Sequence, residues 1–289
     1  MTLLLAGLLL LATPPAWQWP AAERVVALGD VHGDLRATRT ALRLGGLTDA
    51  DGRWTGGQTV LVQTGDVLDR GDGEREIFEL LFRLQGEAQA AGGRVVLLNG
   101  NHELMNAAGD LRYVTPGGFA AFTDTWLPGD GLGPVPIWAR GRRAAFMPGG
   151  PWAKRLAELP VVATVGDTAF VHGGLLADHV GQVPAMHRAV YAWLNGAGPL
   201  PRALFVEDAP VWTRRWSSGP LTAGDCAELS RVLSGFGVNR LVVGHTVQPT
   251  ITQACDGAVW RVDVGMAAHY GGQPAVLEIK GDAVRAVTR

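Results

Sequence analysis

The chain repeats one local pattern, in which a short run of aliphatic and β-branched residues leads into a polar cluster that contains glycine. Such runs are typical of buried strands, and the polar clusters mark the carboxyl ends of those strands. Helical periodicity between the early runs gives the order strand, helix, strand, which predicts an α/β fold with partly parallel sheets. The predicted strands cover residues 24–28, 59–63, 94–98, 168–171, 240–243, 259–264 and 275–279.

Two helices are predicted between the first three strands. One covers Leu35–Leu44 and follows Asp34, a residue type that suits a helix N-cap. The other covers residues 74–91, which have apolar side chains along one face. Residues 105–160 and 195–224 are rich in glycine, and we interpret them as long loops that form lids or substrate walls.

Composition excludes several classes of protein. The 289 residues are 47% apolar and 18% charged, which is sufficient for a large core and is unlike a disordered chain. The formal net charge of −2 provides no overall basic field, so we expect neither nucleic acid nor an anionic membrane as a partner. We find no repeat and no convincing domain boundary after the N-terminal segment, and therefore predict one domain.

The first 22 residues differ from the remainder. Residues 3–12 form an apolar run that fits the core of a signal peptide and is too short to span a bilayer, which takes about 20 residues. We predict a signal peptide or an apolar N-terminal arm over residues 1–22, followed by a single domain over residues 23–289. Export to the periplasm or another extracytoplasmic space is the expectation, without stable membrane insertion, and a cytoplasmic location is the alternative.

Cys226 and Cys255 are the only cysteines in the chain. Their even number is compatible with one disulfide in an oxidising compartment. Two unpaired thiols in the core are the other interpretation, and the one we favour from the sequence.

Four of the seven histidines fall in the clusters at the predicted strand ends, next to aspartate and asparagine. Hard divalent cations prefer carboxylate and amide oxygens, whereas transition metals also accept imidazole. A mixture of these donors without cysteine indicates manganese, iron or zinc. A carboxylate on a central strand can bridge two such ions. The residues concerned are Asp30, His32, Asp66, Asp69, Asn101, His102, His172 and His245.

Taken together, the strand-end strings resemble the calcineurin-like metallophosphoesterases. Within that family they are similar to the phosphoprotein-phosphatase branch, and most of all to the bacterial Shewanella-like phosphatases. The resemblance implies a four-layer α/β/β/α sandwich with mixed sheets and a metal site at the carboxyl ends of the strands. The strings that carry it are Gly-Asp-Val-His-Gly (29–33), Gly-Asp-Val-Leu-Asp-Arg-Gly (65–71), Gly-Asn-His-Glu-Leu-Met-Asn (100–106), Gly-Asp-Leu-Arg-Tyr (109–113), His-Gly-Gly (172–174), Gly-His (244–245) and Asp-Val-Gly-Met (263–266).

The resemblance also implies a metal-ligand set for two divalent ions, for which manganese is the first expectation and iron or zinc the alternatives. Asp30 and His32 are then ligands of the first ion, and Asp66 bridges the two ions. The second ion is bound by Asn101, His172 and His245.

The catalytic roles implied by the resemblance are those of a phosphomonoesterase that uses in-line attack by a metal-bridging hydroxide. His102 is the general acid for the departing oxygen, and Asp69 orients it. Arg70 and a second arginine hold the phosphoryl oxygens. We choose Arg214 as the second arginine, with Arg215 as the alternative.

The expected substrate is a phosphorylated protein, with phosphotyrosine or mixed specificity, or a small phosphoester. Trp212 and Trp216 flank Arg214 and could provide an aromatic wall for a phosphotyrosine ring. A nucleotide phosphoesterase, such as a diadenosine polyphosphate hydrolase, is the alternative enzyme, and an inactive metal-stabilised binding module is the non-enzyme alternative. Glu103 receives no chemical role and is expected to form only hydrogen bonds.

Overall fold

The computed structural model describes residues 13–126, 132 and 134–288, and within them it contains eleven strands and eight α-helices. The strands are β1 (Gln18–Trp19), β2 (Val25–Leu28), β3 (Val60–Gln63), β4 (Arg94–Leu97), β5 (Val162–Val165), β6 (Thr168–Val171), β7 (Arg240–Val243), β8 (Thr252–Ala254), β9 (Val259–Arg261), β10 (Val276–Lys280) and β11 (Ala283–Val287). The helices are α1 (Leu35–Leu44), α2 (Glu74–Ala90), α3 (Asn101–Ala108), α4 (Pro116–Ala120), α5 (Ile137–Phe146), α6 (Pro151–Ala157), α7 (Val183–Leu194) and α8 (Ala223–Phe236), and short 3₁₀ helices cover Thr123–Thr125, Ala177–His179 and Arg202–Leu204.

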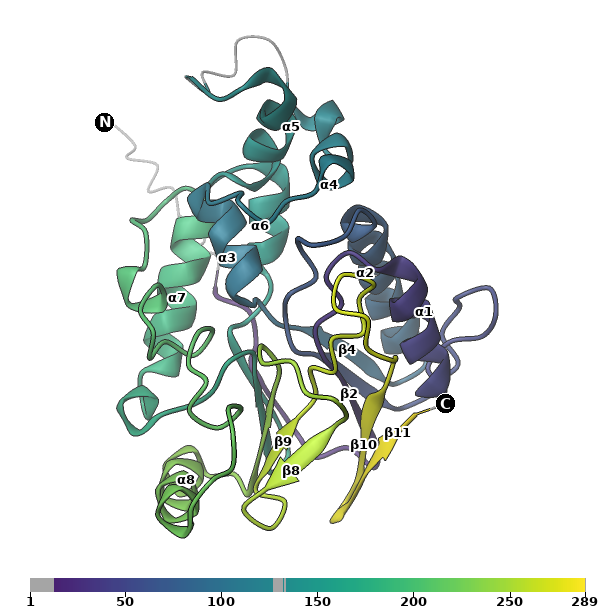
Figure 1. The fold of residues 1–289 in the computed structure, drawn as a ribbon, viewed down its shortest axis with the longest axis vertical. Coiled ribbons are helices and arrows are strands. Elements are labelled where there is room, and N and C mark those ends of the chain that lie inside the picture. The colour runs from purple at the N-terminus through teal and green to yellow at the C-terminus, as the bar shows by residue number, and fades with distance from the viewer. Residues whose placement is uncertain (1–12, 127–131, 133, 289) are drawn as a thin grey trace, which may run out of the picture.

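The strands form two mixed sheets that pack against each other. One sheet has the order β11-β10-β2-β3-β4 and the other the order β1-β5-β6-β7-β9-β8. In Figure 1, α1 and α2 lie outside the first sheet, whereas α7 and α8 lie on the opposite side of the molecule. The α/β/β/α sandwich with mixed sheets that the sequence predicts is therefore confirmed.

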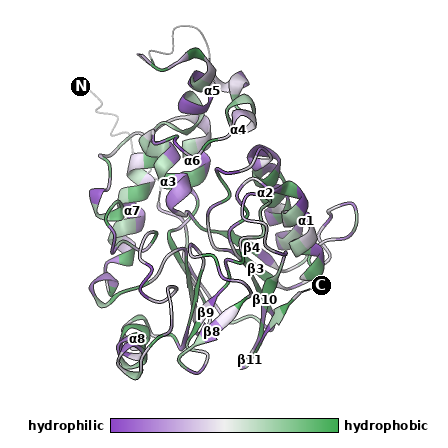
Figure 2. Cartoon of the chain, in the orientation of Figure 1, coloured by the Kyte–Doolittle hydropathy of each residue, from purple (hydrophilic) through white to green (hydrophobic). Residues whose placement is uncertain are grey.

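Strand register brings the polar clusters to one edge of the sandwich. In the first sheet β2, β3 and β4 are parallel, with Val25 opposite Val60 and Val60 opposite Arg94, so all three strands end level with one another. In the second sheet β6 and β7 are also parallel and in register. Nearly every residue of these five strands is buried, because helices or the other sheet cover both faces, and Figure 2 shows hydrophobic residues along the central strands.

The two predicted helices form at nearly the predicted positions. Helix α1 has the predicted bounds, and its N-cap Asp34 accepts a hydrogen bond from the backbone N–H of Ala37 at 2.8 Å. Helix α2 ends at Ala90, one residue before the prediction.

The prediction of a long loop over residues 105–160 is wrong, because half of α3 and all of α4, α5 and α6 lie there. Glycine was the misleading signal. Gly141 lies inside α5, and a Cβ atom at that position would come within 2.3 Å of the Phe122 carbonyl oxygen. This glycine allows close packing of a helix and does not break it. In the second predicted loop, over residues 195–224, only a short 3₁₀ helix lies before α8, which begins at Ala223.

The N-terminal segment contributes one strand to the fold. Strand β1 is parallel to β5, with Gln18 opposite Thr164, so the second sheet begins within the segment that the sequence pattern separates from the domain. Residues 1–12, which carry the apolar run, lie outside the described residues. In the described part of the chain, no helix combines the length and apolar character needed to cross a bilayer.

The prediction of unpaired cysteines is also wrong, because Cys226 and Cys255 form a disulfide. Cys226 lies in the first turn of α8, and Cys255 lies in the turn between β8 and β9. Neither side chain is part of the buried core, and their Cα atoms are 5.2 Å apart, a separation suited to a disulfide.

Two loops at the sheet edge approach so closely that only glycine fits between them. A Cβ atom on Gly65, after β3, would lie 2.6 Å from the backbone nitrogen of Gly100, after β4. A Cβ atom on Gly100 would lie 2.1 Å from Oδ1 of Asp66. The position of Asp66 therefore depends on the missing side chain of Gly100.

Replacing Gly100 with alanine should lower the free energy of unfolding by about 1–3 kcal/mol, the usual cost of overpacking. Gly86 is the matched control, because it is an exposed residue in α2 with open space around its Cα. Gly86→Ala should raise stability by about 1 kcal/mol through helix propensity. Denaturant unfolding measures both variants, and a Gly100→Ala protein as stable as the unmodified one would contradict the close packing of these two loops.

Candidate active site at the strand ends

The loops after five strands place the polar residues together. Asp30 and His32 follow β2, and Asp66, Asp69 and Arg70 follow β3. Asn101 and His102 are the first residues of α3, directly after β4. In the second sheet, His172 follows β6 and His245 follows β7. Every metal-ligand candidate from the sequence is thus at the same edge of the sandwich.

Backbone strain is concentrated in the same loops. Seven non-glycine residues of the described chain have a positive φ angle, and five of them are candidate site residues. Such conformations cost on the order of 1 kcal/mol or more each, and they persist only where the surrounding structure holds them. The five are His32 (40°), Asp66 (57°), Asp69 (69°), Arg70 (70°) and His245 (66°).

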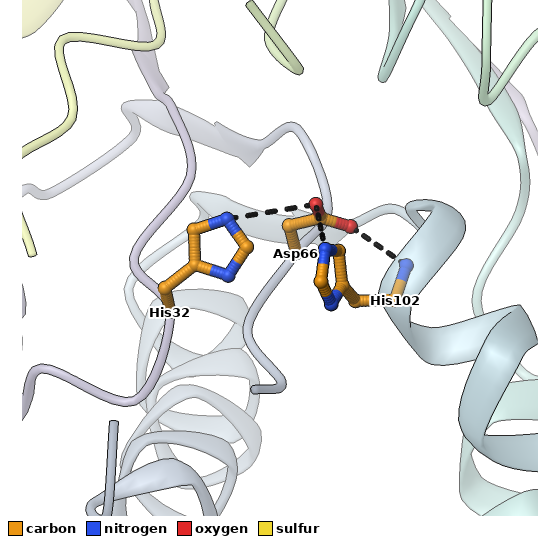
Figure 3. Close-up of side chains that lie close together, drawn as sticks. All are labelled: His32, Asp66 and His102. Carbon is orange, nitrogen blue, oxygen red and sulfur yellow. Dashed lines mark hydrogen bonds and ion pairs between the residues drawn. The ribbon is translucent and has the colours of Figure 1, made fainter. Parts of the chain in front are cut away.

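Asp66 is at the centre of the cluster. Its Oδ2 atom lies 3.2 Å from Nε2 of His172 and 3.7 Å from Nε2 of His32. The same oxygen is 3.8 Å from Nε2 of His102, whose backbone N–H donates to Oδ1 at 3.0 Å. Figure 3 shows His32 and His102 on two sides of this carboxylate.

Among the residues that the structure describes, two groups of side chains have the geometry to hold a cation, and Asp66 belongs to both. One group comprises His32, Asp66 and His102, and the other comprises Asp66, His172 and His245. In each group the three ligand atoms lie within 4.8 Å of one another. A carboxylate shared in this way can bridge two metal ions.

Hydrogen bonds to backbone carbonyls orient two of the histidines. The Nδ1 atom of His32 lies 3.0 Å from the Leu68 oxygen, and Nδ1 of His172 lies 3.1 Å from the Thr64 oxygen. A carbonyl oxygen only accepts, so Nδ1 carries the proton in both rings and the Nε2 lone pair faces the cluster. This is the arrangement of a histidine that binds a metal through Nε2.

The donor atoms around Nε2 of His172 fit a cation. Oδ1 of Asn101 is 2.8 Å from this nitrogen, and Nδ1 of His245 is 3.1 Å from it. The other ring nitrogen of His245, Nε2, is buried without a hydrogen-bond partner in the described chain. Lone pairs that converge in this way repel one another unless a positive charge lies among them, so these residues fit a metal ion.

The carboxylates give the same indication. Burial, followed by the negative charges of Asp263 and Asp66, raises the pKa of Asp30 well above its usual value. Burial also raises the pKa of Asp263 to about 6 and that of Glu103 to about 7. Asp66 is the exception: burial acts to raise its pKa, but the neighbouring His172 and His102 lower it well below its usual value. This concentration of buried acids favours the binding of cations.

Glu103 holds the Asp66 loop in place. Its Oε2 atom accepts hydrogen bonds from the backbone N–H groups of Asp66 and Gly100, both at 2.8 Å. Its Oε1 atom accepts from the N–H groups of Val67 and Leu68 at 2.9 and 3.0 Å. Glu103 therefore fixes the backbone on which Asp66 is carried.

His102, which belongs to the first of the two metal-ligand groups, forms a buried pair with Asp69, which belongs to neither. Nδ1 of His102 lies 2.5 Å from Oδ2 of Asp69, which leaves Nε2 turned toward Asp66. Burial acts to lower the pKa of His102, but the charge of Asp66 and the hydrogen bond with Asp69 outweigh it and raise this pKa to about 9. His102 can therefore carry a proton at neutral pH and present it from Nε2.

Of the three candidate arginines, Arg70 and Arg214 lie at the site and Arg215 does not. The guanidinium carbon of Arg70 lies 3.9 Å from the centre of the Tyr113 ring. Arg214 donates to the backbone oxygen of His245 at 2.7 Å. Arg215 is directed away, because it pairs with Asp225 and Glu228 at 2.6 and 2.8 Å.

Aromatic side chains surround the cluster, and the sequence predicts a role for only one of them, Trp212. Between ring centres, the distance from Tyr113 to His102 is 5.2 Å, and that from Tyr270 to His32 is 5.4 Å. The ring centres of Trp212 and His245 are 6.0 Å apart. Trp212 also lines a pocket of about 410 Å³ that Arg214 and His245 border. Tyr113 lies in the quoted string 109–113, which was a usable signal, whereas no motif marks Tyr270.

Comparison with known proteins agrees with this geometry. Shewanella-like protein phosphatase 2 of Arabidopsis thaliana is 40% identical in an alignment that covers 92% of this chain and 78% of that protein. Shewanella-like protein phosphatase 1 of Plasmodium berghei is 32% identical, with coverage of 91% and 74%. The crystal structure of a cold-active protein-tyrosine phosphatase from a psychrophilic Shewanella species superposes with a TM-score of 0.74 at 27% identity, over 96% of this chain and 83% of that one.

The resemblance expected from the strand-end strings is thereby confirmed. The model of the calcineurin-like phosphoesterase family matches residues 23–249, more than three quarters of the chain. The chain therefore belongs to the calcineurin-like phosphoesterases, and it is a hydrolase of the phosphatase type.

Proposed function

We propose that this protein is a phosphomonoesterase with two divalent metal ions and that its substrates are phosphoproteins, phosphotyrosine among them. The observation that carries the proposal is the position of Asp66, whose carboxylate belongs to both groups of metal-ligand atoms. Asp30, whose Oδ2 atom is 3.9 Å from Nε2 of His32, would complete the ligands of one ion together with His32. We assign the remaining member of that group, His102, to proton donation and not to metal binding. Asn101, His172 and His245 complete the ligands of the other ion.

The donor set suits manganese, with iron or zinc as alternatives. It combines imidazole nitrogen with carboxylate and amide oxygen and contains no thiolate, since both cysteines are joined in the disulfide. When bound, two divalent ions polarise the phosphoryl oxygens and lower the pKa of water toward about 7, which supplies a nucleophile at neutral pH.

The protein's own residues bind the phosphate and protonate the leaving group. Arg70 and Arg214 hold the phosphoryl oxygens by charge-assisted hydrogen bonds. His102 donates the proton on Nε2 to the departing oxygen, and Asp69 keeps the ring oriented by accepting from Nδ1. Because Asp69 is buried next to His102, it also favours the protonated ring.

The surroundings of Arg214 favour an aromatic phosphoester. Phe205 and Trp212 line the pocket that adjoins Arg214, and Tyr113 and Tyr270 lie against His102 and His32. A phosphotyrosine ring can pack against such side chains at offset-stacked or edge-to-face geometry. The likeness to a protein-tyrosine phosphatase supports the same substrate class.

A substrate panel with the Mn²⁺-loaded protein tests the proposed function. Phosphotyrosine peptides should be hydrolysed faster than phosphoserine peptides of the same sequence, because only the former offer a ring to the aromatic side chains. Initial rates of phosphate release measure both. Rapid cleavage of diadenosine tetraphosphate without turnover of either peptide would contradict the proposal.

The role of the His102 pair is tested by Asp69→Asn. This change should lower kcat for a phosphoester with a poor leaving group by about 10²–10⁴-fold, because it removes the acceptor that orients the general acid. Metal content, measured by elemental analysis, should not change, since Asp69 belongs to neither ligand group.

Asp72→Asn is the matched control for that experiment, because Asp72 lies in the same loop and accepts a hydrogen bond from Thr115 at the surface. Its kcat should equal that of the unmodified enzyme. An Asp69→Asn enzyme with full activity on poor leaving groups would exclude His102 as the general acid.

A further inference from the structure

A fully buried arginine lies behind the pair of His102 and Asp69. While Oδ2 of Asp69 accepts from His102, its other oxygen, Oδ1, accepts from Nη2 of Arg142 at 3.1 Å and from Nδ2 of Asn106 at 3.0 Å. The side chains of Arg142 and Asp69 are both 0% exposed. Both carboxylate oxygens of Asp69 are therefore engaged, one toward the site and one away from it.

Every N–H of the Arg142 guanidinium has an acceptor. Nε donates to Oδ1 of Asn106 at 2.8 Å, and Nη1 donates to Glu74 and to the Gly118 oxygen. Nη2 donates to Asp69 and to the second oxygen of Glu74, each at 3.1 Å. The five donors of arginine are thus matched by five contacts. A lysine has three donors and no planar fork, so it cannot reproduce this arrangement.

Two phenylalanines and Glu74 restrict the network further. The guanidinium carbon of Arg142 lies 5.1 Å from the centre of the Phe122 ring and 5.0 Å from that of Phe146. Glu74, besides pairing with Arg142, accepts the backbone N–H of Asp69. The carboxylate and the backbone of Asp69 are therefore held by the same buried group of charges.

This arrangement resists rotation of the Asp69 carboxylate. If that group turned about its Cβ–Cγ bond, Oδ2 would leave Nδ1 of His102, and Oδ1 would lose Arg142 and Asn106 at the same time. An unpaired buried guanidinium is strongly unfavourable, so the rotation is opposed by more than the His102 contact alone. The orientation of His102 then depends on a residue that is not at the site.

We propose that Arg142 is a positioning residue for the general acid, acting through Asp69 on His102. The inference rests on the proposed function, in which His102 protonates the leaving oxygen. It assigns a role to helix α5, which lies at one end of the molecule in Figure 1 and contributes no side chain to the two metal-ligand groups. A purely structural ion pair, which only fastens α5 to α2, is the interpretation that the experiment must separate from it.

The dependence of kcat on the leaving group distinguishes a positioning role of Arg142 from a purely structural one. Arg142→Met should lower kcat for phenyl phosphate by about 10²-fold and kcat for 4-nitrophenyl phosphate by less than about tenfold, because the more acidic nitrophenol needs little protonation as it departs. KM and the content of bound Mn²⁺ should stay as in the unmodified enzyme. Equal losses for both esters, or loss of metal, would make the role structural and overturn the proposal.

A double-mutant cycle with Asp69 tests whether Arg142 acts through that residue. In an Asp69→Asn background, Arg142→Met should change kcat for phenyl phosphate by no more than about threefold, since the orienting contact is already lost. Full additivity of the two effects would overturn the proposal.

Arg143→Met is the matched control, because Arg143 is the next residue of α5 and donates instead to the Ala107 oxygen at 3.1 Å. It should leave kcat for both esters unchanged.

If Arg142→Met does not fold, Arg142→Lys keeps the charge and should still lower the phenyl phosphate rate selectively. Unmodified rates in the lysine variant would overturn the proposal. An unmodified enzyme that is inactive on both esters would refute the proposed function itself, whereas an active one that is indifferent to Arg142 refutes only the positioning role.

Discussion

One carboxylate joins the two halves of this molecule. Asp66 extends from the first sheet, yet its Oδ2 atom lies 3.2 Å from Nε2 of His172, which belongs to the second sheet. The distance from the same oxygen to Nε2 of His32, in its own sheet, is longer, at 3.7 Å. The contact requires the strand ends of both sheets to lie level at one edge of the sandwich. The glycines that allow the loops to touch, the positive φ angle of Asp66 and the four hydrogen bonds accepted by Glu103 all serve that position.

Three residues further along the same loop, Asp69 has different surroundings. Asp66 is placed among histidines that face a cation site, whereas Asp69 lies between His102 and the buried Arg142. In the mechanism we propose, the first carboxylate serves the attacking side of the reaction and the second serves the leaving group. A single strained loop thereby fixes the distance between the two functions, and helix α5 supports one of them from behind.

Local sequence was sufficient for much of this arrangement. Asp30, His32, Asp66 and Asn101 follow buried strands directly, so the pattern of strand and glycine predicts where each one lies. Arg142 could not be found in this way, because it contacts Asp69 and Glu74 across 73 and 68 residues and lies within residues 105–160, whose glycine content predicts a loop. The disulfide likewise depends on how α8 packs near the turn between β8 and β9. The spacing of the two cysteines along the sequence does not predict that packing. Of the two adjacent arginines, Arg215 pairs with acids on α8, whereas Arg214 donates to the backbone oxygen of His245.

The bridging position of Asp66 can be observed directly. Crystals of the protein grown with Mn²⁺ should show two anomalous-scattering peaks about 3.5–4 Å apart, the usual spacing of a two-metal site, with the Asp66 carboxylate contacting both. His32 should adjoin one peak, and His172 and His245 the other. A single peak, or two peaks that do not share Asp66, would contradict a bridging role for this carboxylate and the two-metal mechanism that depends on it.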